Sequence, residues 1–363
     1  MFQPIDYEYL DPILGATSTE LSSAALGGRV LGCSDEWFAE ARNLIKPNAA
    51  ESLRGQFGPR GALYDGWETR RHNRTHDWAL IRLAPAGGGH ITGLDVDTST
   101  FDGNEGPAAE VYGMYLPDAD PTADDERWEL LLPRIRCGPL AHHLHAYSDA
   151  EGTPKKYTHV LLLMIPDGGF SRFRVYGAVA PAPVGHGVGE VVVPGAPERN
   201  TLDLAHALNG GRVVFTNDQH FGRGTNVLLP GRGENMGDGW ETKRSRVAGH
   251  YDWLVVKLGE RGVLERVEVD TMHFLGNYPD SFTLDGCDWE GNVPPGHADL
   301  SSPLWEPLVG RKQLGPGKVH QFDVETARKP LTHVRLAIYP DGGIKRLRLV
   351  GRRAGSCVQL NSR

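Results

Sequence analysis

Several side chains that could move protons or hold a carboxylate crowd into one short stretch of this 363-residue chain. Glu68, Arg70, Arg71 and His72 stand within five positions, and His76 follows four residues later. A Glu or His with a shifted pKa serves as a general acid or base, and Arg donates paired hydrogen bonds to carboxylates. The stretch therefore predicts acid–base chemistry on a small anion. Cross-strand Glu–Arg pairs and Asp-Gly turns are also common structural features, so for Glu68 and Arg71 both interpretations stay open.

This stretch belongs to a motif that the chain contains twice. Residues 65–71 read Asp-Gly-Trp-Glu-Thr-Arg-Arg and return almost unchanged at 238–244, while a Pro-Asp-Gly-Gly turn occurs at 166–169 and again at 340–343. A typical domain has roughly 100–150 residues, so a duplication of this length predicts two domains of one fold. The predicted segments are an N-terminal extension (1–26), a first sandwich (27–177), a Pro/Gly-rich linker (178–203), a second sandwich (204–351) and a C-terminal tail (352–363).

Strands rather than helices are predicted to position the reactive residues. Apolar side chains recur at every second position in stretches such as 78–83, 160–165 and 253–258, and Gly, Pro, Asp and Asn separate these stretches. In 171–176 and 345–350 Arg alternates with apolar residues, as in a sheet with one solvent-exposed face. Many short strands at regular spacing predict an all-β protein with two tandem jelly-roll-like antiparallel β-sandwich domains.

Composition and charge argue against several classes of partner. The net charge of −8 and the pI near 6.0 do not suit a nucleic-acid-binding protein. The four cysteines form no Cys-x-x-Cys pair and none recurs in both copies, which favours reduced thiols. The N-terminus lacks the basic and apolar regions of a secretory signal, and the longest apolar run, 160–165, is too short to span a membrane. We therefore expect a cytoplasmic protein with no nucleic-acid and no membrane partner.

Comparing the two copies separates shared residues from unshared ones. The shared reactive positions are Glu68 and Glu241, Arg71 and Arg244, and Asp97 and Asp270. Either the fold needs them, or both copies carry a site, or one site takes groups from each copy. If one copy alone is catalytic, its chemistry should use unshared residues. His72 and His76 favour the first copy because His titrates near neutral pH, while His273 keeps the second copy open.

Two acidic pairs could bind a hard cation. Side chains alternate along a strand, so Asp95 and Asp97 point to one face, and Glu268 and Asp270 repeat this arrangement. Two close carboxylates could share a proton or hold such a cation, although a solvent-facing strand end gives the same pattern without function.

A His-rich segment, 142–145, resembles a metal site only at first sight. No zinc motif is complete, and His145, which we align with His320 of the second copy, is expected to be structural. The sequence therefore predicts no certain cofactor, and leaves room for a weakly bound divalent cation.

The repeated motifs resemble those of the allantoicase family, from about residue 27 to residue 351. They comprise residues 65–71, 76–78, 95–98, 101 and 103–104 in the first copy, and 238–244, 251–253, 269–271 and 274–279 in the second. Two ordered copies of such motifs are a specific signal. The resemblance implies tandem galactose-binding-like β-sandwiches, hydrolysis of allantoate to ureidoglycolate and urea in purine breakdown, and assembly as a homo-oligomer.

Allantoate carries one carboxylate and two ureido groups on a single carbon, which sets three tasks for a site. Arg should hold the carboxylate, an acid should protonate the departing ureido nitrogen, and a base should activate water. The predicted catalytic residues are Glu68, His76, Asp97, Glu241 and Asp270. The predicted substrate-binding residues are Arg70, Arg71, His72, Asn104, Arg244, His273 and Asn277.

Two other functions fit the same fold. A non-catalytic tandem carbohydrate- or ligand-binding β-sandwich protein is the first, because fold alone does not fix function. Such modules are usually secreted and favour exposed aromatic platforms, whereas the motifs here are dense in Glu, Arg, Asp and His. An allantoicase-like chain without turnover is the second.

Overall fold

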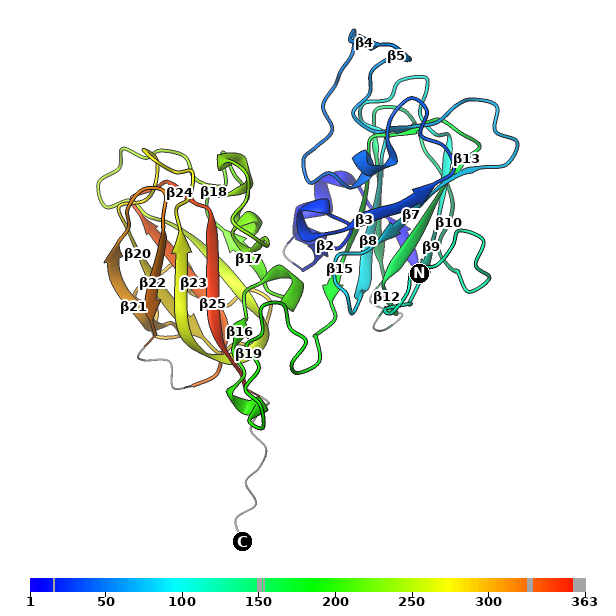
Figure 1. Ribbon diagram of the computed structural model, residues 1–363. Helices are drawn as coiled ribbons and strands as arrows, with labels where there is room; N and C mark the ends of the chain where they lie inside the picture. The colour runs from blue at the N-terminus through cyan, green and yellow to red at the C-terminus, as the bar shows by residue number, and fades with distance from the viewer. Residues whose placement is uncertain (16, 149–151, 153, 325–328, 355–363) are drawn as a thin grey trace. The chain divides into compact units, whose positions relative to one another are not determined.

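The computed structural model describes residues 1–15, 17–148, 152, 154–324 and 329–354. The chain divides into two compact units, Met1–Ala180 and Pro181–Arg363. Each unit is built from antiparallel strands, as the sequence predicted (Figure 1). The fold is therefore all-β, with two β-sandwiches in tandem.

The first unit contains two large sheets. One has the order β1 (Phe2–Pro4), β11 (His142–Tyr147), β8 (Gly89–Asp97), β15 (Arg172–Val179) and β2 (Thr19–Glu20), with β12 (Lys156–Tyr157) paired to β8. The other has the order β10 (Glu129–Arg136), β9 (Ala108–Met114), β13 (His159–Ile165), β7 (Asp77–Arg82) and β3 (Arg29–Cys33). Two small pairs complete the unit: β6 (Trp67–Glu68) with β14 (Gly169–Phe170), and β4 (Phe57–Gly58) with β5 (Gly61–Ala62).

Alternation of apolar side chains places the first core between these sheets. Val96 and Phe173 of the six-stranded sheet pack in one cluster with Ile81 and Val160 of the five-stranded sheet. Their polar neighbours along β8 and β15 therefore lie on the opposite, outer face of the six-stranded sheet.

The first residues of the chain cover that outer face. Strand β1 extends the sheet beside β11, and the short helices η1 (Tyr7–Tyr9) and η2 (Leu10–Gly15) follow. Leu14 and Leu10 pack with Leu144, and the ring of Tyr7 stacks on His142 with centroids 3.7 Å apart. The segment thus forms part of the first unit.

In the second unit one long strand joins both layers. Strand β19 (Asp252–Asp270) pairs with β23 through residues 252–257 and with β25 through residues 262–270. The eight-stranded sheet has the order β16 (Leu202–Asp203), β25 (Arg346–Arg353), β19, β23 (Leu331–Tyr339), β20 (Ser281–Cys287) and β21 (Glu306–Gln313), with β17 (Arg212–Thr216) and β22 (Val319–Asp323) also on β19. Strands β18 (Trp240–Glu241) and β24 (Gly343–Ile344) form a separate pair.

Helical segments are short in both units. Within the described ranges the others are η3 (Ala24–Leu26), η4 (Ala41–Ile45), η6 (Pro197–Arg199), η7 (Ala207–Asn209), η8 (Gly224–Leu228) and η9 (Met236–Asp238). Within the residues that the structure describes, no helix combines the length and apolarity needed to cross a membrane.

Three cysteines, Cys33, Cys137 and Cys287, are free thiols, and burial raises the pKa of each to about 12. Cys357 lies outside the described residues.

Candidate active site

A glutamate–asparagine pair stands at the same place in each unit. Asn104 Nδ2 donates to Glu68 Oε1 over 2.8 Å, and Asn277 Nδ2 donates to Glu241 Oε1 over 2.6 Å. In each case the Glu comes from a two-stranded pair and the Asn from the loop after a long central strand. The sequence singled out all four residues, and the structure brings them together in two matching pairs.

Burial makes the first pair chemically distinctive. Glu68 is only 8% exposed, and burial raises the pKa of its carboxyl group, although Asn104 and the charge of Arg71 oppose this shift. Asn104 Oδ1 is also buried and accepts no hydrogen bond from any described residue. A buried carboxyl group with a raised pKa thus lies beside an amide oxygen that lacks a donor.

Arg71 supplies positive charge next to this pair. Its Nη1 lies 3.2 Å from Asp167 Oδ1, while Asp167 Oδ2 accepts a hydrogen bond from the backbone N–H of Asn73 over 2.8 Å. In the second unit Asp341 accepts from the Ser245 amide over 2.8 Å in the same way. These aspartates were interpreted from sequence only as turn residues, yet their presence in both Pro-Asp-Gly-Gly motifs was a usable signal.

The second unit lacks the matching ion pair. Arg244, the counterpart of Arg71, is exposed and forms no ion pair within the described part of the chain. Glu241 is half-buried, so its carboxyl group is less enclosed than that of Glu68.

Close packing against an aromatic ring holds the loop that carries each asparagine. Phe101 is fully buried, and Tyr64 stacks on it with ring centroids 4.7 Å apart. Gly169, which pairs with Glu68, lies so close that a Cβ there would stand 2.0 Å from the Phe101 ring. Gly343 and Phe274 repeat this contact at 2.0 Å. Glycine is therefore needed at both positions.

The acidic residue at the end of each long strand fixes the start of the same loop. Asp97 Oδ1 accepts from the Ser99 amide over 2.7 Å, and Asp270 Oδ1 accepts from the Met272 amide over 2.9 Å. Asp270 also forms an ion pair with Arg232 at 3.2 Å. This geometry gives both aspartates a positioning contact.

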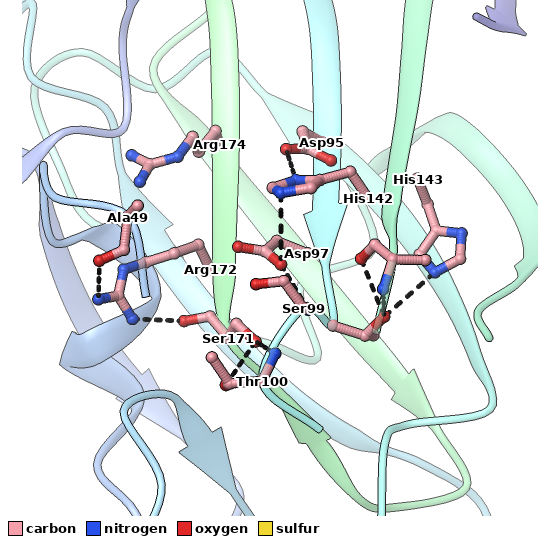
Figure 2. A network of polar contacts seen from close by, with 12 residues as sticks. Ala49, Asp95, Asp97, Ser99, Thr100, His142, His143, Ser171, Arg172 and Arg174 are labelled. Carbon is pink, nitrogen blue, oxygen red and sulfur yellow. Dashed lines mark hydrogen bonds and ion pairs between the residues drawn. The ribbon is translucent and has the colours of Figure 1, made fainter. Parts of the chain in front are cut away.

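Asp95 and Asp97 share one face of β8, as alternation predicted, and His142 of β11 approaches both (Figure 2). His142 Nδ1 lies 2.8 Å from Asp95 Oδ2, and its Nε2 lies 3.9 Å from Asp97 Oδ1. Burial lowers the pKa of His142, but the hydrogen bond and charge of Asp95 outweigh it, so the net shift is upward. Among the described residues, no group of three or more His, Cys, Asp or Glu is arranged to hold a metal ion.

For the other predicted residues the structure gives different contacts or an unusual backbone conformation. Arg70 donates to Asp35 Oδ1 over 2.9 Å. His76 borders a separate hollow of about 230 Å³ with aromatic neighbours that include Trp78. His72 and His273 have φ angles of +73° and +69°, a left-handed conformation that is uncommon for residues other than glycine.

Strand register corrects one alignment between the copies. His143 faces Val96 across β11 and β8, and His320 faces Val269 across β22 and β19. Because Val96 and Val269 each precede the last aspartate of their strand, the counterpart of His320 is His143, not His145. The alignment by apolar pattern was two residues out of register, which alternation along a strand cannot detect.

Comparisons with known proteins agree with the repeat. The allantoicase repeat family matches residues 19–180 and 202–354. A probable allantoicase of Schizosaccharomyces pombe is 45% identical over 351 residues, covering 96% of this chain and 97% of the relative. The allantoicase of Saccharomyces cerevisiae is 41% identical, covering 92% of this chain and 94% of the relative. A crystal structure of allantoicase from S. cerevisiae superposes with a TM-score of 0.80 at 37% identity, covering 97% of this chain and all of that one.

The duplicated sandwich, its repeated Glu–Asn pair and these matches define the chain as a tandem β-sandwich hydrolase. Enzyme relatives at this coverage do not favour a non-catalytic carbohydrate-binding protein. The chain belongs to the allantoicase family, as its motifs indicated.

Proposed function

We propose that this chain hydrolyses allantoate to ureidoglycolate and urea, and that Glu68, Asn104 and Arg71 form the substrate site. Membership of the allantoicase family supports the reaction. The observation that carries the site is the buried Asn104 Oδ1, which accepts no hydrogen bond from a described residue and lies next to a buried carboxyl group. A ureido N–H would satisfy that oxygen.

Arg71 is the group that holds the carboxylate of allantoate. A guanidinium donates two parallel hydrogen bonds to a carboxylate, and Asp167 holds the Arg71 guanidinium in place through an ion pair. Asn104 then accepts a hydrogen bond from the ureido group that departs. The carbon that links carboxylate and ureido groups is thereby placed beside Glu68.

Glu68 performs the proton transfers. In its protonated form it gives a proton to the departing ureido nitrogen as the C–N bond breaks, which releases urea. A water molecule then forms a C–O bond to the same carbon and returns a proton to the Glu68 carboxylate. The raised pKa of Glu68 suits this cycle, because at a given pH more of the protein molecules carry a protonated Glu68 than they would with a glutamate of ordinary pKa.

The first unit is assigned the reaction because its set is the more complete. Asn277 and Glu241 keep the pair, but the pKa is raised for Glu68 and no comparable enclosure surrounds Glu241. Asp97 and Asp270 are assigned to positioning. His72, His76, His273 and Arg244 remain candidates for contacts that change on substrate binding.

Activity is expected to fall as pH rises through the raised pKa of Glu68. Above that pKa the general acid loses its proton, so kcat/KM should drop about tenfold per pH unit. The free energy of unfolding should also fall as pH rises. The pKa of Glu68 in the folded protein exceeds the ordinary value of 4.5, so the contribution of Glu68 to stability is complete below pH 4.5 and is lost as pH rises through the folded pKa. Glu68→Gln should remove this limb from both profiles, measured by urea release and by denaturant unfolding. An unchanged rate profile in the variant would assign the limb to another group.

Arg71→Met should weaken substrate binding more than turnover. Charge-assisted hydrogen bonds contribute about 1.5–3 kcal/mol, so KM should rise about 10- to 100-fold with kcat nearly unchanged. Arg74, an exposed neighbour, offers a matched control, and Arg74→Met should leave KM within about twofold. Equal KM values for the two variants would remove Arg71 from the site.

The reaction itself is tested by incubating the purified protein with allantoate and following urea together with ureidoglycolate. One urea per allantoate consumed is the expected result. Allantoate left intact would contradict the proposed activity and would favour an inactive member of the family.

Location, assembly and metal dependence complete the proposal. We place the protein in the cytoplasm and expect a homo-oligomer, which size-exclusion chromatography with light scattering would detect. A weakly bound divalent cation on the carboxylates would show as activity lost on chelation and restored by the ion.

A further inference from the structure

A hollow of about 790 Å³ opens on the second unit, and neither Glu241 nor Asn277 lines it. Asp203 of β16 and Arg348 of β25 form part of its lining, together with His206, Arg232 and Glu268. None of the reactions assigned above uses these residues.

Two buried atoms in this lining lack hydrogen-bond partners. Asp203 Oδ2 and Arg348 Nη1 are both enclosed, and neither forms a hydrogen bond with any residue in the described ranges. Asp203 is only 9% exposed, and its Oδ2 lies 3.6 Å from Arg348 Nε, an ion-pair distance without a hydrogen bond. A buried acceptor and a buried donor that stay unpaired are costly, so a ligand that satisfies both would bind favourably.

At the corresponding position of the first unit, the acidic residue and the arginine are hydrogen-bonded to each other. Glu20 and Arg174 occupy the registers of Asp203 and Arg348, because Glu20 faces Tyr176 as Asp203 faces Val350. Arg174 Nη1 donates to Glu20 Oε1 over 2.7 Å. Here the pair is complete.

Two exchanges of residue types, Ser22 against Ala205 and Glu20 against Asp203, explain the difference. In the first unit Ser22 Oγ accepts from the Val175 amide over 3.0 Å, and Glu20 accepts from Arg174. The second unit has Ala205 instead of that serine, so Asp203 Oδ1 accepts from the Leu349 amide over 3.0 Å. The shorter aspartate then cannot also bind the guanidinium closely.

The two faces also differ in what covers them. In the first unit the N-terminal residues pack over the sheet, with Tyr7 stacked on His142. In the second unit the corresponding face holds the hollow, and Val188 and Val191 form part of its rim. The sheet face that the N-terminal residues cover in the first unit therefore carries a hollow in the second unit.

Charge in the hollow favours a neutral ligand over an anion. Each lining arginine has a carboxylate nearby: Arg348 has Asp203, Arg232 has Asp270, and Arg266 lies 3.3 Å from Glu268. Burial, reinforced by the charge of Arg348, lowers the pKa of His206 to about 4, so this ring is neutral at neutral pH. His206 Nδ1 accepts from the Leu208 amide, which leaves Nε2 as a donor.

We propose that this hollow is a second small-molecule site, which binds a ureido group through its carbonyl oxygen at Arg348 Nη1 and one N–H at Asp203 Oδ2. A ureido group places an acceptor and a donor side by side, as the two unpaired atoms require. The choice of ureido compounds among amide-like ligands rests on the proposed function, because substrate and product both carry that group.

The test uses N-methylurea as the probe and saturation-transfer NMR on the full-length protein. The wild-type protein should give a methyl signal, and acetate at equal concentration should not reduce it. Asp203→Glu combined with Ala205→Ser transplants the closed pair of the first unit and should weaken binding about tenfold. The matched control, Glu20→Asp with Ser22→Ala, makes the reverse exchange under the N-terminal cover and should bind as wild type.

Several outcomes would overturn the proposal: no methyl signal, full competition by acetate, or unchanged binding in the Asp203→Glu/Ala205→Ser variant. A signal that disappears in Glu68→Gln would place the ligand at the catalytic pair instead. Urea release from allantoate is measured in parallel, and the Asp203→Glu/Ala205→Ser variant should keep it. Probe binding without any wild-type urea release would refute the proposed function and leave the hollow intact as a site.

Discussion

Replacing Glu68 with Gln is expected to lower kcat for urea release from allantoate by about 10²- to 10⁴-fold, the usual contribution of a positioned general acid. The substitution preserves shape, and the new amide oxygen can still accept the hydrogen bond from Asn104 Nδ2. What is lost is the ability of this side chain to give and take a proton. Urea production under saturating allantoate measures the effect, and KM should change little.

The second unit provides the matched control for this substitution. Glu241→Gln alters the same motif and the same Asn contact, but in the less enclosed pair. Its kcat should stay within about tenfold of wild type, because the reaction is assigned to the first unit. If Glu241→Gln loses as much activity as Glu68→Gln, the site needs both units and the assignment to one is wrong.

The largest expected loss of stability comes from Asp285→Ala. Arg335 is fully buried, and its Nε and Nη2 donate to Asp285 Oδ2 over 3.1 and 2.9 Å. Removing the carboxylate leaves a buried guanidinium with no anionic partner among the described residues, only backbone carbonyls and the Trp305 ring, which should cost about 3–5 kcal/mol of unfolding free energy. Urea-induced unfolding followed by tryptophan fluorescence measures this loss.

The first unit again supplies the control, because it has no ion pair at this position. Tyr112 faces Leu161 there, in the register that Asp285 and Arg335 occupy in the second unit. Asp285→Tyr with Arg335→Leu removes both charges and should cost clearly less than Asp285→Ala alone. A double variant that unfolds as readily as Asp285→Ala would show that packing, rather than the unpaired charge, causes the loss.

Local patterns in the sequence were sufficient to predict the strands and the duplication. The apolar stretches at 78–83 and 160–165 correspond to β7 and β13, because short apolar runs bounded by turn residues are typical of strands that are largely buried. Alternation does not fix register, which is why His145 was aligned where His143 belongs. The sequence also does not predict β19 as one continuous strand, because Gly259 to Gly262 interrupt the apolar pattern as a turn would.

The sequence predicts the individual residues of the candidate site, but not which of them form hydrogen bonds with each other. Glu68 and Asn104 lie 36 positions apart, and non-local contacts such as the packing of Phe101 against Gly169 bring the loop back to the strand. Asp167 was overlooked because turn chemistry explained it fully. The exchange of Ser22 for Ala205 looks trivial in sequence, and its effect on Arg348 appears only when backbone partners are known.

The most direct test of where the substrate binds is a crystal structure of the Glu68→Gln variant soaked with allantoate. Density for the substrate should lie against Asn104 Oδ1, with its carboxylate on Arg71 and one ureido nitrogen next to position 68. Substrate seen only elsewhere, with Asn104 Oδ1 still without a donor, would contradict the assignment of the first unit's pair as the catalytic site.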